Sequence, residues 1–226
     1  MTTKRQLADE FRSLGVRAGD VLLVHSAMKP LGPVEGGCTG VLDALFDVLT
    51  GTGTLLMPAL TYTTVTKEQP VFSAAGSPSC VGKLSETFRR TPGVLRSVHP
   101  THSVCAAGKL ARELTGEHLL DRTPVGSHSP FRKLAGCGGK ILMLGCGLSP
   151  NTFMHGVEEE AKAPYCLDPE PVEYTCVLED GRRITGRYTP HWFRHILQRY
   201  DRVGELPDSS YLRHGKTGNG DAYLLD

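Results

Sequence analysis

The sequence predicts an α/β fold, a single domain in which helices flank a mixed β-sheet. Short apolar runs of strand length alternate with amphipathic segments of helical period over most of the 226 residues. Glycine- and proline-rich turns separate these segments. Because no internal repeat, low-complexity tract or linker divides the chain, we expect one domain over residues 1–226.

Each predicted element rests on the spacing of apolar residues and on the turn residues beside it. A helix is expected where apolar residues recur every three or four positions after a capping residue, and a strand where a short apolar run lies between turns. In the first part of the chain these patterns predict a helix over 4–14, a strand over 21–24, a helix capped by Thr39, a strand over 54–57, a polar surface excursion over 61–79, a helix over 81–90, a strand over 103–107, a helix over 109–115 and a helix capped by Ser129.

A strand, a glycine turn and a helix follow in close succession and organise the second part of the chain. The apolar run 141–144 predicts the strand, and Gly145 with Gly147 predicts a tight turn that lets another molecule approach the backbone. Ser149 and Pro150 are expected to cap and begin the helix. The remaining predicted elements are a hairpin of 173–178 and 184–188, an amphipathic helix over 190–200 and a short apolar tail after a glycine-rich turn.

Composition indicates a cytoplasmic protein with no membrane partner. The chain is 39% hydrophobic and 22% charged, as expected of an ordinary globular protein, and its apolar runs are too short to span a bilayer. The N-terminus lacks the apolar segment of a signal peptide. Seven cysteines without a C-x-x-C pair indicate buried, reduced thiols.

The charges are unevenly distributed along the chain. Residues 81–140 hold ten Lys/Arg against four Asp/Glu, and residues 155–180 hold eight Asp/Glu against one lysine. A chain that binds an anionic ligand beside a cationic one is expected to show this pattern. The basic stretch lacks interleaved aromatic residues, so nucleic acid is not a predicted partner.

The helix after 141–144 carries a candidate general base. His155, Glu158 and Glu159 lie three and four residues apart, so they share one face of a helix. Ligands of α/β folds bind beyond the carboxyl ends of strands, which is where this helix begins. The pattern lacks the second histidine of a zinc-binding helix, so no metal is predicted.

Other histidines and small hydroxyl residues lie at predicted strand ends or helix starts. They are His25-Ser26, His99, the segment 101–103 and the segment 127–129. Hydroxyls and free backbone N–H groups at such ends bind phosphates and oxyanions. Together the clusters indicate several loops that converge on one cleft.

Six ordered stretches resemble the aminoglycoside 3-N-acetyltransferase family, the antibiotic acetyltransferases, which are distinct from the GNAT superfamily. They are VLLVHSAMKPLGPVEGG, GTLLMPAL, FRRTPGVLRSVHPTHSVCAAG, PVGSHSPFRKL, ILMLGCGLSPNTFMHGVEEEA and GNGDAYLLD. The resemblance implies the family's fold, acetyl-coenzyme A (acetyl-CoA) as acetyl donor and an amine as acceptor, often a polycationic aminoglycoside. It also favours a homodimer.

The resemblance also implies roles for particular residues. His155, in the family's T-x-x-H block with Thr152, is the implied general base, and Glu158 orients it or holds the ammonium group. A histidine, with an ordinary pKa of about 6.5, suits this task at neutral pH. The residues expected to bind the cofactor are His25, Ser26, Ala27, Met28, Leu31, Gly32, Thr101, Ser103 and Ser129. Those expected to bind the substrate are Tyr62, Thr152 and Glu159.

Two departures from the family pattern keep alternatives open. The segment 58–96 is shorter than in resistance enzymes, and residues 149–151 lack the aspartate that members often carry before the histidine. Acetylation of an amino sugar in a biosynthetic pathway is therefore an alternative function. Others are a non-catalytic coenzyme A-binding module and a hydrolase with a Ser–His or Cys–His pair, for which no nucleophile motif is present.

Overall fold

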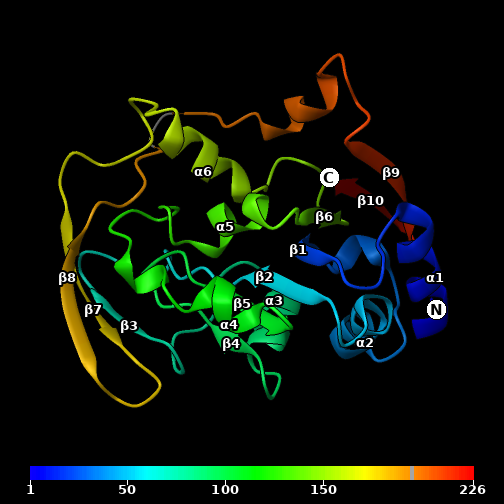
Figure 1. Ribbon diagram of the computed structural model, residues 1–226, viewed down its shortest axis with the longest axis horizontal. Helices are drawn as coiled ribbons and strands as arrows, with labels where there is room; N and C mark the ends of the chain where they lie inside the picture. The colour runs from blue at the N-terminus through cyan, green and yellow to red at the C-terminus, as the bar shows by residue number, and fades with distance from the viewer. Residues whose placement is uncertain (194–195) are drawn as a thin grey trace.

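A seven-stranded mixed sheet forms the centre of the protein (Figure 1). The structure is a computed structural model that describes residues 1–193 and 196–226. The three inner strands run parallel and the outer ones pair antiparallel, which confirms the predicted mixed α/β architecture. In spatial order the strands are β4 (Leu95–Arg96), β5 (Val104–Gly108), β2 (Thr54–Pro58), β1 (Val21–Ser26), β6 (Lys140–Leu144), β10 (Gly220–Leu225) and β9 (Leu212–Thr217).

Helices cover both faces of this sheet, and short 3₁₀ turns connect the elements. One face packs against α1 (Lys4–Leu14), α2 (Gly37–Leu49) and α3 (Lys83–Arg89). The other packs against α4 (Ala111–Thr115), α5 (Pro130–Gly136) and the first residue of α6 (Phe153–Glu160). The 3₁₀ turns are η1 (Lys29–Leu31), η2 (His118–Leu120) and η3 (Tyr200–Glu205). All helices of the described residues are too short or too polar to form a membrane-spanning segment.

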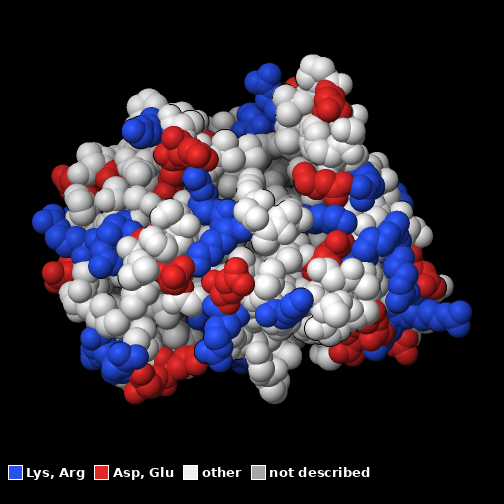
Figure 2. Space-filling model, in the orientation of Figure 1, with Lys and Arg blue, Asp and Glu red and all other residues white. Residues whose placement is uncertain are grey.

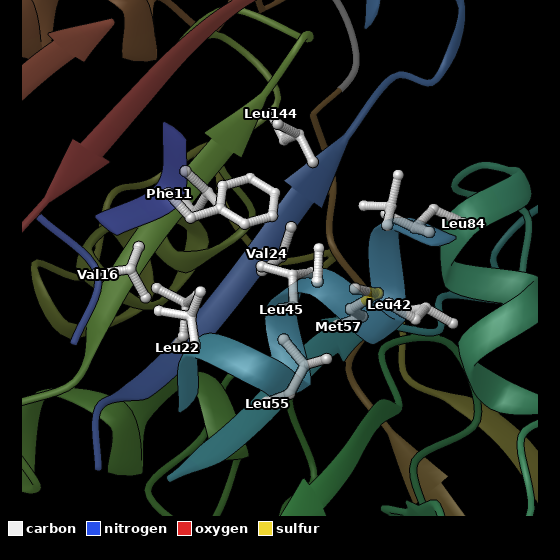
Figure 3. Packing of buried hydrophobic residues seen from close by; sticks show 14 of the residues in the cluster. Phe11, Val16, Leu22, Val24, Leu42, Leu45, Leu55, Met57, Leu84 and Leu144 are labelled. Carbon is white, nitrogen blue, oxygen red and sulfur yellow. The ribbon is translucent and has the colours of Figure 1, made fainter. Parts of the chain in front are cut away.

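The core divides into two layers because successive side chains of a strand point to opposite faces. Figure 3 shows the first layer, in which Leu22 and Val24 of β1 pack with Phe11 of α1 and Leu45 of α2. The residue between them, Leu23, belongs to the opposite layer. Strands buried on both faces read as continuous apolar runs, which is why β1, β2 and β6 were predictable.

A smaller sheet stands beside the main one. It consists of β3 (Val71–Ser73), β7 (Val172–Val177) and β8 (Arg183–Tyr188), and the β7–β8 hairpin confirms the prediction. β3 lies within the excursion 61–79, where we predicted no strand. It pairs in parallel with the distant β7, Val71 lying opposite Thr175. Because its partner is so far away in the sequence, no local pattern indicated the strand. In Figure 1 this sheet lies at the edge opposite α1.

The predicted helix over 190–200 is wrong for the described residues. His191 forms an antiparallel bridge with Leu167, and the backbone N–H of Trp192 donates to the Cys166 carbonyl at 2.8 Å. The backbone thus finds its partners in another segment, and residues 196–199 are also not helical. The rest of this prediction, residues 194–195, falls outside the described residues. After β8 the chain crosses over α6 towards η3 and β9 (Figure 1).

Two predicted helix starts also differ. α2 begins at Gly37 with Gly36 as its N-cap, so Thr39 lies inside the helix. α6 begins at Phe153 rather than at Pro150, and its N-cap is Thr152, whose side chain makes no capping bond. The buried Asn151 side chain accepts the Phe153 N–H at 3.3 Å, so the helix start does not use Ser149. Ser129 caps α5 as predicted.

Charges of both signs are interspersed among the described side chains on the face shown in Figure 2. The basic and acidic stretches even pair with each other, since Arg132 lies 3.1 Å from Glu160. This face therefore presents no broad area of a single sign.

Buried histidines join the two sheets. His99 stacks on His118 with ring centroids 4.9 Å apart and meets Tyr188 of β8 edge-on at 5.4 Å. His118 is fully buried, and burial, followed by the smaller repulsion of Lys133 and His128, lowers its pKa to about 3. The neutral ring has a hydrogen bond at each nitrogen, with the Ser97 hydroxyl at 2.9 Å and the Pro124 carbonyl at 3.3 Å.

We predict that His118 makes the protein less stable in acid. Between its ordinary pKa of about 6.5 and its folded pKa of about 3, the unfolded chain binds a proton that the folded chain excludes, so stability falls as the pH falls. Urea unfolding at several pH values measures the free energy of unfolding. As the pH falls, this free energy should decrease less steeply for His118→Gln than for the wild type, by up to about 1.4 kcal/mol per pH unit. Parallel curves for the wild type and His118→Gln would contradict the assignment.

Candidate active site

A cavity of about 720 Å³ opens at the carboxyl ends of the three parallel strands. Ser26 ends β1, Pro58 ends β2 and Cys146 follows β6, and all three line it. Gly145 has a φ of 71°, and a Cβ there would lie 2.6 Å from the Ala27 carbonyl oxygen, so only glycine fits this turn beside β1. The cavity thus lies where α/β folds bind ligands.

His155 reaches this cavity from the first turn of α6. The helix can pack closely because Gly156 faces Val125, where an added Cβ would lie 2.7 Å from a side-chain carbon. The His155 side chain is 14% exposed, so the ring is shielded yet open to the cavity. Its Nδ1 lies 2.8 Å from the Tyr200 hydroxyl.

The hydrogen bonds of Tyr200 determine which nitrogen of His155 carries the proton. The hydroxyl has a single hydrogen, and its other neighbours are the Glu158 carboxylate, which can only accept, and the Gln198 amide group, which donates to it. The Tyr200 O–H therefore donates to Glu158, and the Nδ1–H of His155 donates to the Tyr200 oxygen. This leaves Nε2 of His155 with a free lone pair, as a general base requires.

Glu158 is held as a carboxylate. Burial by itself would raise its pKa, but the nearby His155 ring, 3.8 Å away, and the hydrogen bond from Tyr200 outweigh burial and lower the pKa below its ordinary value. The Tyr165 hydroxyl donates to Oε1 of Glu158 at 3.2 Å, and the Gln198 amide donates to Oε2 at 3.0 Å. Burial, followed by the adjacent Glu158 carboxylate, raises the pKa of Tyr200, so its hydroxyl stays a donor.

Two further imidazoles surround His155. The ring centroid of His191 lies 4.9 Å from that of His155, and the centroid of His102 lies 4.7 Å from that of His191. Burial, followed by the repulsion of the neighbouring imidazoles, lowers the pKa of His102. Burial also lowers the pKa of His191, although the hydrogen bond with Glu159 opposes this shift. Both rings are therefore neutral at physiological pH.

Two polar atoms at the end of β1 have no hydrogen-bond partner among the described residues. They are Nε2 of His25 and the hydroxyl of Ser26, both buried and both in the cavity lining. Burial, followed by the repulsion of His155, lowers the pKa of His25 to about 3. Because buried polar groups are normally paired, these atoms indicate a ligand that pairs with them.

The structure brings together some of the residues that we predicted for the site and separates others. Gly32 and the buried Leu31 belong to the turn after β1, outside the lining. Glu158 lies outside it as well and reaches the cavity through Tyr200. The predicted residues that line the cavity are His25, Ser26, Tyr62, Thr101, Thr152 and His155, and those outside it also include Ala27, Met28, Ser103, Ser129 and Glu159.

Three of the outer residues have structural partners instead. Ser129 is buried and accepts the Phe131 N–H as the cap of α5. The Ser103 hydroxyl donates to the Ala59 carbonyl at 2.7 Å. Glu159 is 7% exposed, and its carboxylate accepts from His191 at 2.7 Å and from the backbone of Val125 at 2.8 Å. One oxygen of the Glu159 carboxylate thus already has two donors, and its contact with an amine substrate stays a prediction.

The backbone donors that we predicted for an oxyanion are also partly engaged. The N–H groups of Thr101 and His102 both donate to Nδ1 of His99, at 3.3 and 3.1 Å. The Ala27 N–H donates to the Leu144 carbonyl within the sheet. The Ser26 hydroxyl remains the donor on this wall of the cavity.

Sequence reasoning missed the residues that the excursion 61–79, the chain in and just before β7 and the segment after β8 contribute. They lie in segments whose place in space depends on non-local pairing, so the sequence carried no direct signal for them. The missed lining residues with polar or aromatic side chains include Thr66, Lys67, Glu68, Asp168, Tyr174, His191, Trp192, Phe193, Gln198 and Tyr200.

Comparison with known proteins places this site in a family context. The model of the family described as aminoglycoside 3-N-acetyltransferase matches residues 23–226. The aminoglycoside N(3)-acetyltransferase III of Pseudomonas aeruginosa is 34% identical over 249 aligned positions, which span 99% of this chain and 88% of the relative. The YokD protein of Bacillus subtilis, described as aminoglycoside N(3')-acetyltransferase-like, is 26% identical over 99% of this chain and 87% of its own.

Solved structures give the same relationship. AAC(3)-Xa superposes with a TM-score of 0.85 at 28% identity, over 100% of this chain and 88% of its own. AAC-IIIb in its binary complex with coenzyme A gives 0.83 at 29% identity, over 100% and 91%. A histidine-to-alanine variant of AAC(3)-IVa in complex with a gentamicin gives 0.81 at 32% identity, over 99% and 83%.

Glu159 should be a strong determinant of stability. Glu159→Ala leaves the N–H groups of His191 and Val125 buried without an acceptor, so we expect a loss of about 2–4 kcal/mol in the free energy of unfolding. Glu160→Ala is the matched control, because that side chain is 71% exposed and should change stability by less than about 1 kcal/mol. Urea denaturation measures both, and equal losses would contradict the assignment.

Proposed function

Since the chain belongs to the aminoglycoside 3-N-acetyltransferase family, we propose that His155 is the general base that activates a primary amine of an aminoglycoside or related amino sugar. The protein is an acyltransferase, and acetyl-CoA is its co-substrate. The observation that carries the proposal is the hydrogen-bond chain from His155 through Tyr200 to Glu158, which leaves one imidazole nitrogen free toward the cavity.

The reaction needs a proton removed before a bond can form. An alkylammonium has no lone pair, so Nε2 of His155 takes one proton and frees the amine to attack the thioester carbon. The C–N bond forms, the carbonyl oxygen becomes negative, and the C–S bond then breaks to release the coenzyme A thiolate. The second proton passes from the nitrogen to the coenzyme A thiolate as the amide forms, so the products are the acetylated amine and coenzyme A. The His155 imidazolium then gives its proton to water and returns to the neutral form.

Glu158 and Tyr200 support the imidazolium that forms in this step. The Nδ1–H of His155 donates to the Tyr200 oxygen, whose own hydrogen points to the Glu158 carboxylate. The Glu158 carboxylate thus stabilises the imidazolium through one intervening hydroxyl. The same two hydrogen bonds also fix the orientation of the His155 ring. Such positioning keeps the base aligned with the incoming amine.

The lining of the cavity suits the two substrates. At the end of β1, the unpaired Ser26 hydroxyl can donate to the thioester oxygen as its charge develops. The lining also contains the acidic Glu68 and Asp168, the basic Lys67 and the aromatic Tyr62 and Trp192. Carboxylates attract ammonium groups, and aromatic faces stack on sugar rings and on cations. A polycationic amino sugar is therefore the proposed acceptor.

The setting of the reaction is a further part of the proposal. All seven cysteines are free, as expected in a reducing compartment, so we propose that the protein works in the cytoplasm. A homodimer stays a prediction from the family. The choice between an antibiotic and a biosynthetic amino sugar depends on the acceptor, which the experiment below identifies.

The proposed base can be tested by release of free coenzyme A from acetyl-CoA, followed with a thiol reagent. We expect His155→Ala to lower kcat about 100- to 10,000-fold on the acceptor that the wild type uses, because general-base catalysis contributes in that range. Coenzyme A affinity, measured by calorimetry, should change little.

Aminoglycosides and simple amino sugars form the acceptor panel, and His214→Ala, at an exposed position in β9, is the control that should keep full turnover. Turnover on amino sugars alone would favour the biosynthetic role. Undiminished turnover of His155→Ala would rule out the proposed base. Coenzyme A binding without turnover on any amine would favour the non-catalytic module.

A further inference from the structure

Three histidines from distant segments bring their rings together in the cavity. His102 precedes β5, His155 lies in α6 and His191 follows β8, and one ring nitrogen of each lies within 4.8 Å of the others. Neutral imidazole is a preferred ligand of borderline transition-metal ions. We propose that this cluster, the three-histidine site, binds a borderline divalent ion such as Zn²⁺ and that the bound ion stops acetyl transfer.

Each ring already has the outer partner that metal-bound histidines usually have. One nitrogen of His191 is held by the Glu159 carboxylate at 2.7 Å. Nδ1 of His102 lies 2.9 Å from the Thr101 hydroxyl, and Nδ1 of His155 lies 2.8 Å from the Tyr200 hydroxyl. Such contacts fix the ring orientation and leave the second nitrogen of each ring to bind the ion.

The free nitrogen of His191 is an independent sign of a missing partner. The His191 side chain is 6% exposed, and its Nδ1 is buried with no hydrogen-bond partner among the described residues. Leaving such an atom unpaired is costly, whereas an ion coordinated by it would satisfy it.

The geometry suits a tetrahedral ion with one open position. Zinc–nitrogen bonds of about 2.0–2.1 Å place ligand nitrogens about 3.3 Å apart, so the rings need to approach by no more than about 1.5 Å. The fourth position faces the cavity, because all three histidines line it. Water or a substrate group can occupy that position.

The inhibitory part of the inference rests on the proposed function. If His155 is the general base, a metal ion on its ring holds the nitrogen that must accept the proton. The ion also places a positive charge where the substrate ammonium has to bind. Zinc should therefore lower turnover reversibly, and a chelator should restore it.

Binding is measured first, on the chelator-treated full chain. Titration with Zn²⁺ against a chromophoric chelator should show one ion per chain, and Co²⁺ should give the intense visible absorption of a tetrahedral site. His102→Gln and His191→Gln should each weaken zinc binding at least about tenfold. His214→Gln should bind as the wild type does, because this exposed histidine lies in β9, outside the cluster. Thermal unfolding confirms that each variant is folded.

Activity is measured next, on the same preparations. We expect the metal-free protein to catalyse acetyl transfer. Zinc should inhibit this reaction, and the zinc concentration that halves the rate should equal the one that half-saturates the site. No stoichiometric zinc binding, or equal binding by all variants, would overturn the site. Bound zinc with unchanged turnover would overturn the inhibitory role alone. A metal-free protein that binds zinc at this site but acetylates no amine would instead contradict the proposed function.

Discussion

The parallel pairing of β1 with β6 is the constraint on which the rest of the site depends. It aligns His25 with Met143 and Ser26 with Leu144, so the two strands end side by side. The chain after β6 must then turn sharply beside β1, which requires glycine at position 145. That turn leads into α6 and brings His155 to the carboxyl ends of the parallel strands. A pairing set by apolar side chains thus positions the ring of the proposed general base.

The polar groups of the site come from segments that the sheet alone does not hold. Glu158 and Glu159 are adjacent on α6 but serve different partners, one the Tyr200–His155 pair and the other His191 and Val125. One carboxylate supports the proposed base, and its neighbour attaches the segment after β8. The same attachment brings His191 next to His155, so the site proposed for proton transfer also has three histidines that could hold a metal ion.

Local patterns predicted the elements whose partners lie nearby or whose burial is uniform. The strands β1 and β6, the helix α1 with its Thr3 cap and the β7–β8 hairpin belong to this group. The position of His155 on a helix after β6 was also predictable. The pattern of residues 190–200 predicted a helix wrongly, because its apolar side chains do not pack on the core as one stripe. They line the cavity or face solvent, and Leu197 is 82% exposed. Ser103 and Ser129 could not be told from ligand-binding residues, since a structural cap and a binding hydroxyl look alike in sequence.

The proposed base depends on Glu158, which acts through Tyr200 to keep the proton of His155 on Nδ1 and to leave Nε2 free. Nitrogen-15 NMR of histidine-labelled protein tests this, because the two neutral tautomers give different ring-nitrogen shifts and couplings. With the His155 signal assigned from His155→Ala, we expect the Nδ1–H tautomer in the wild type and its loss as the dominant form in Tyr200→Phe. A wild-type His155 that carries its proton on Nε2 would contradict the proposed hydrogen-bond chain.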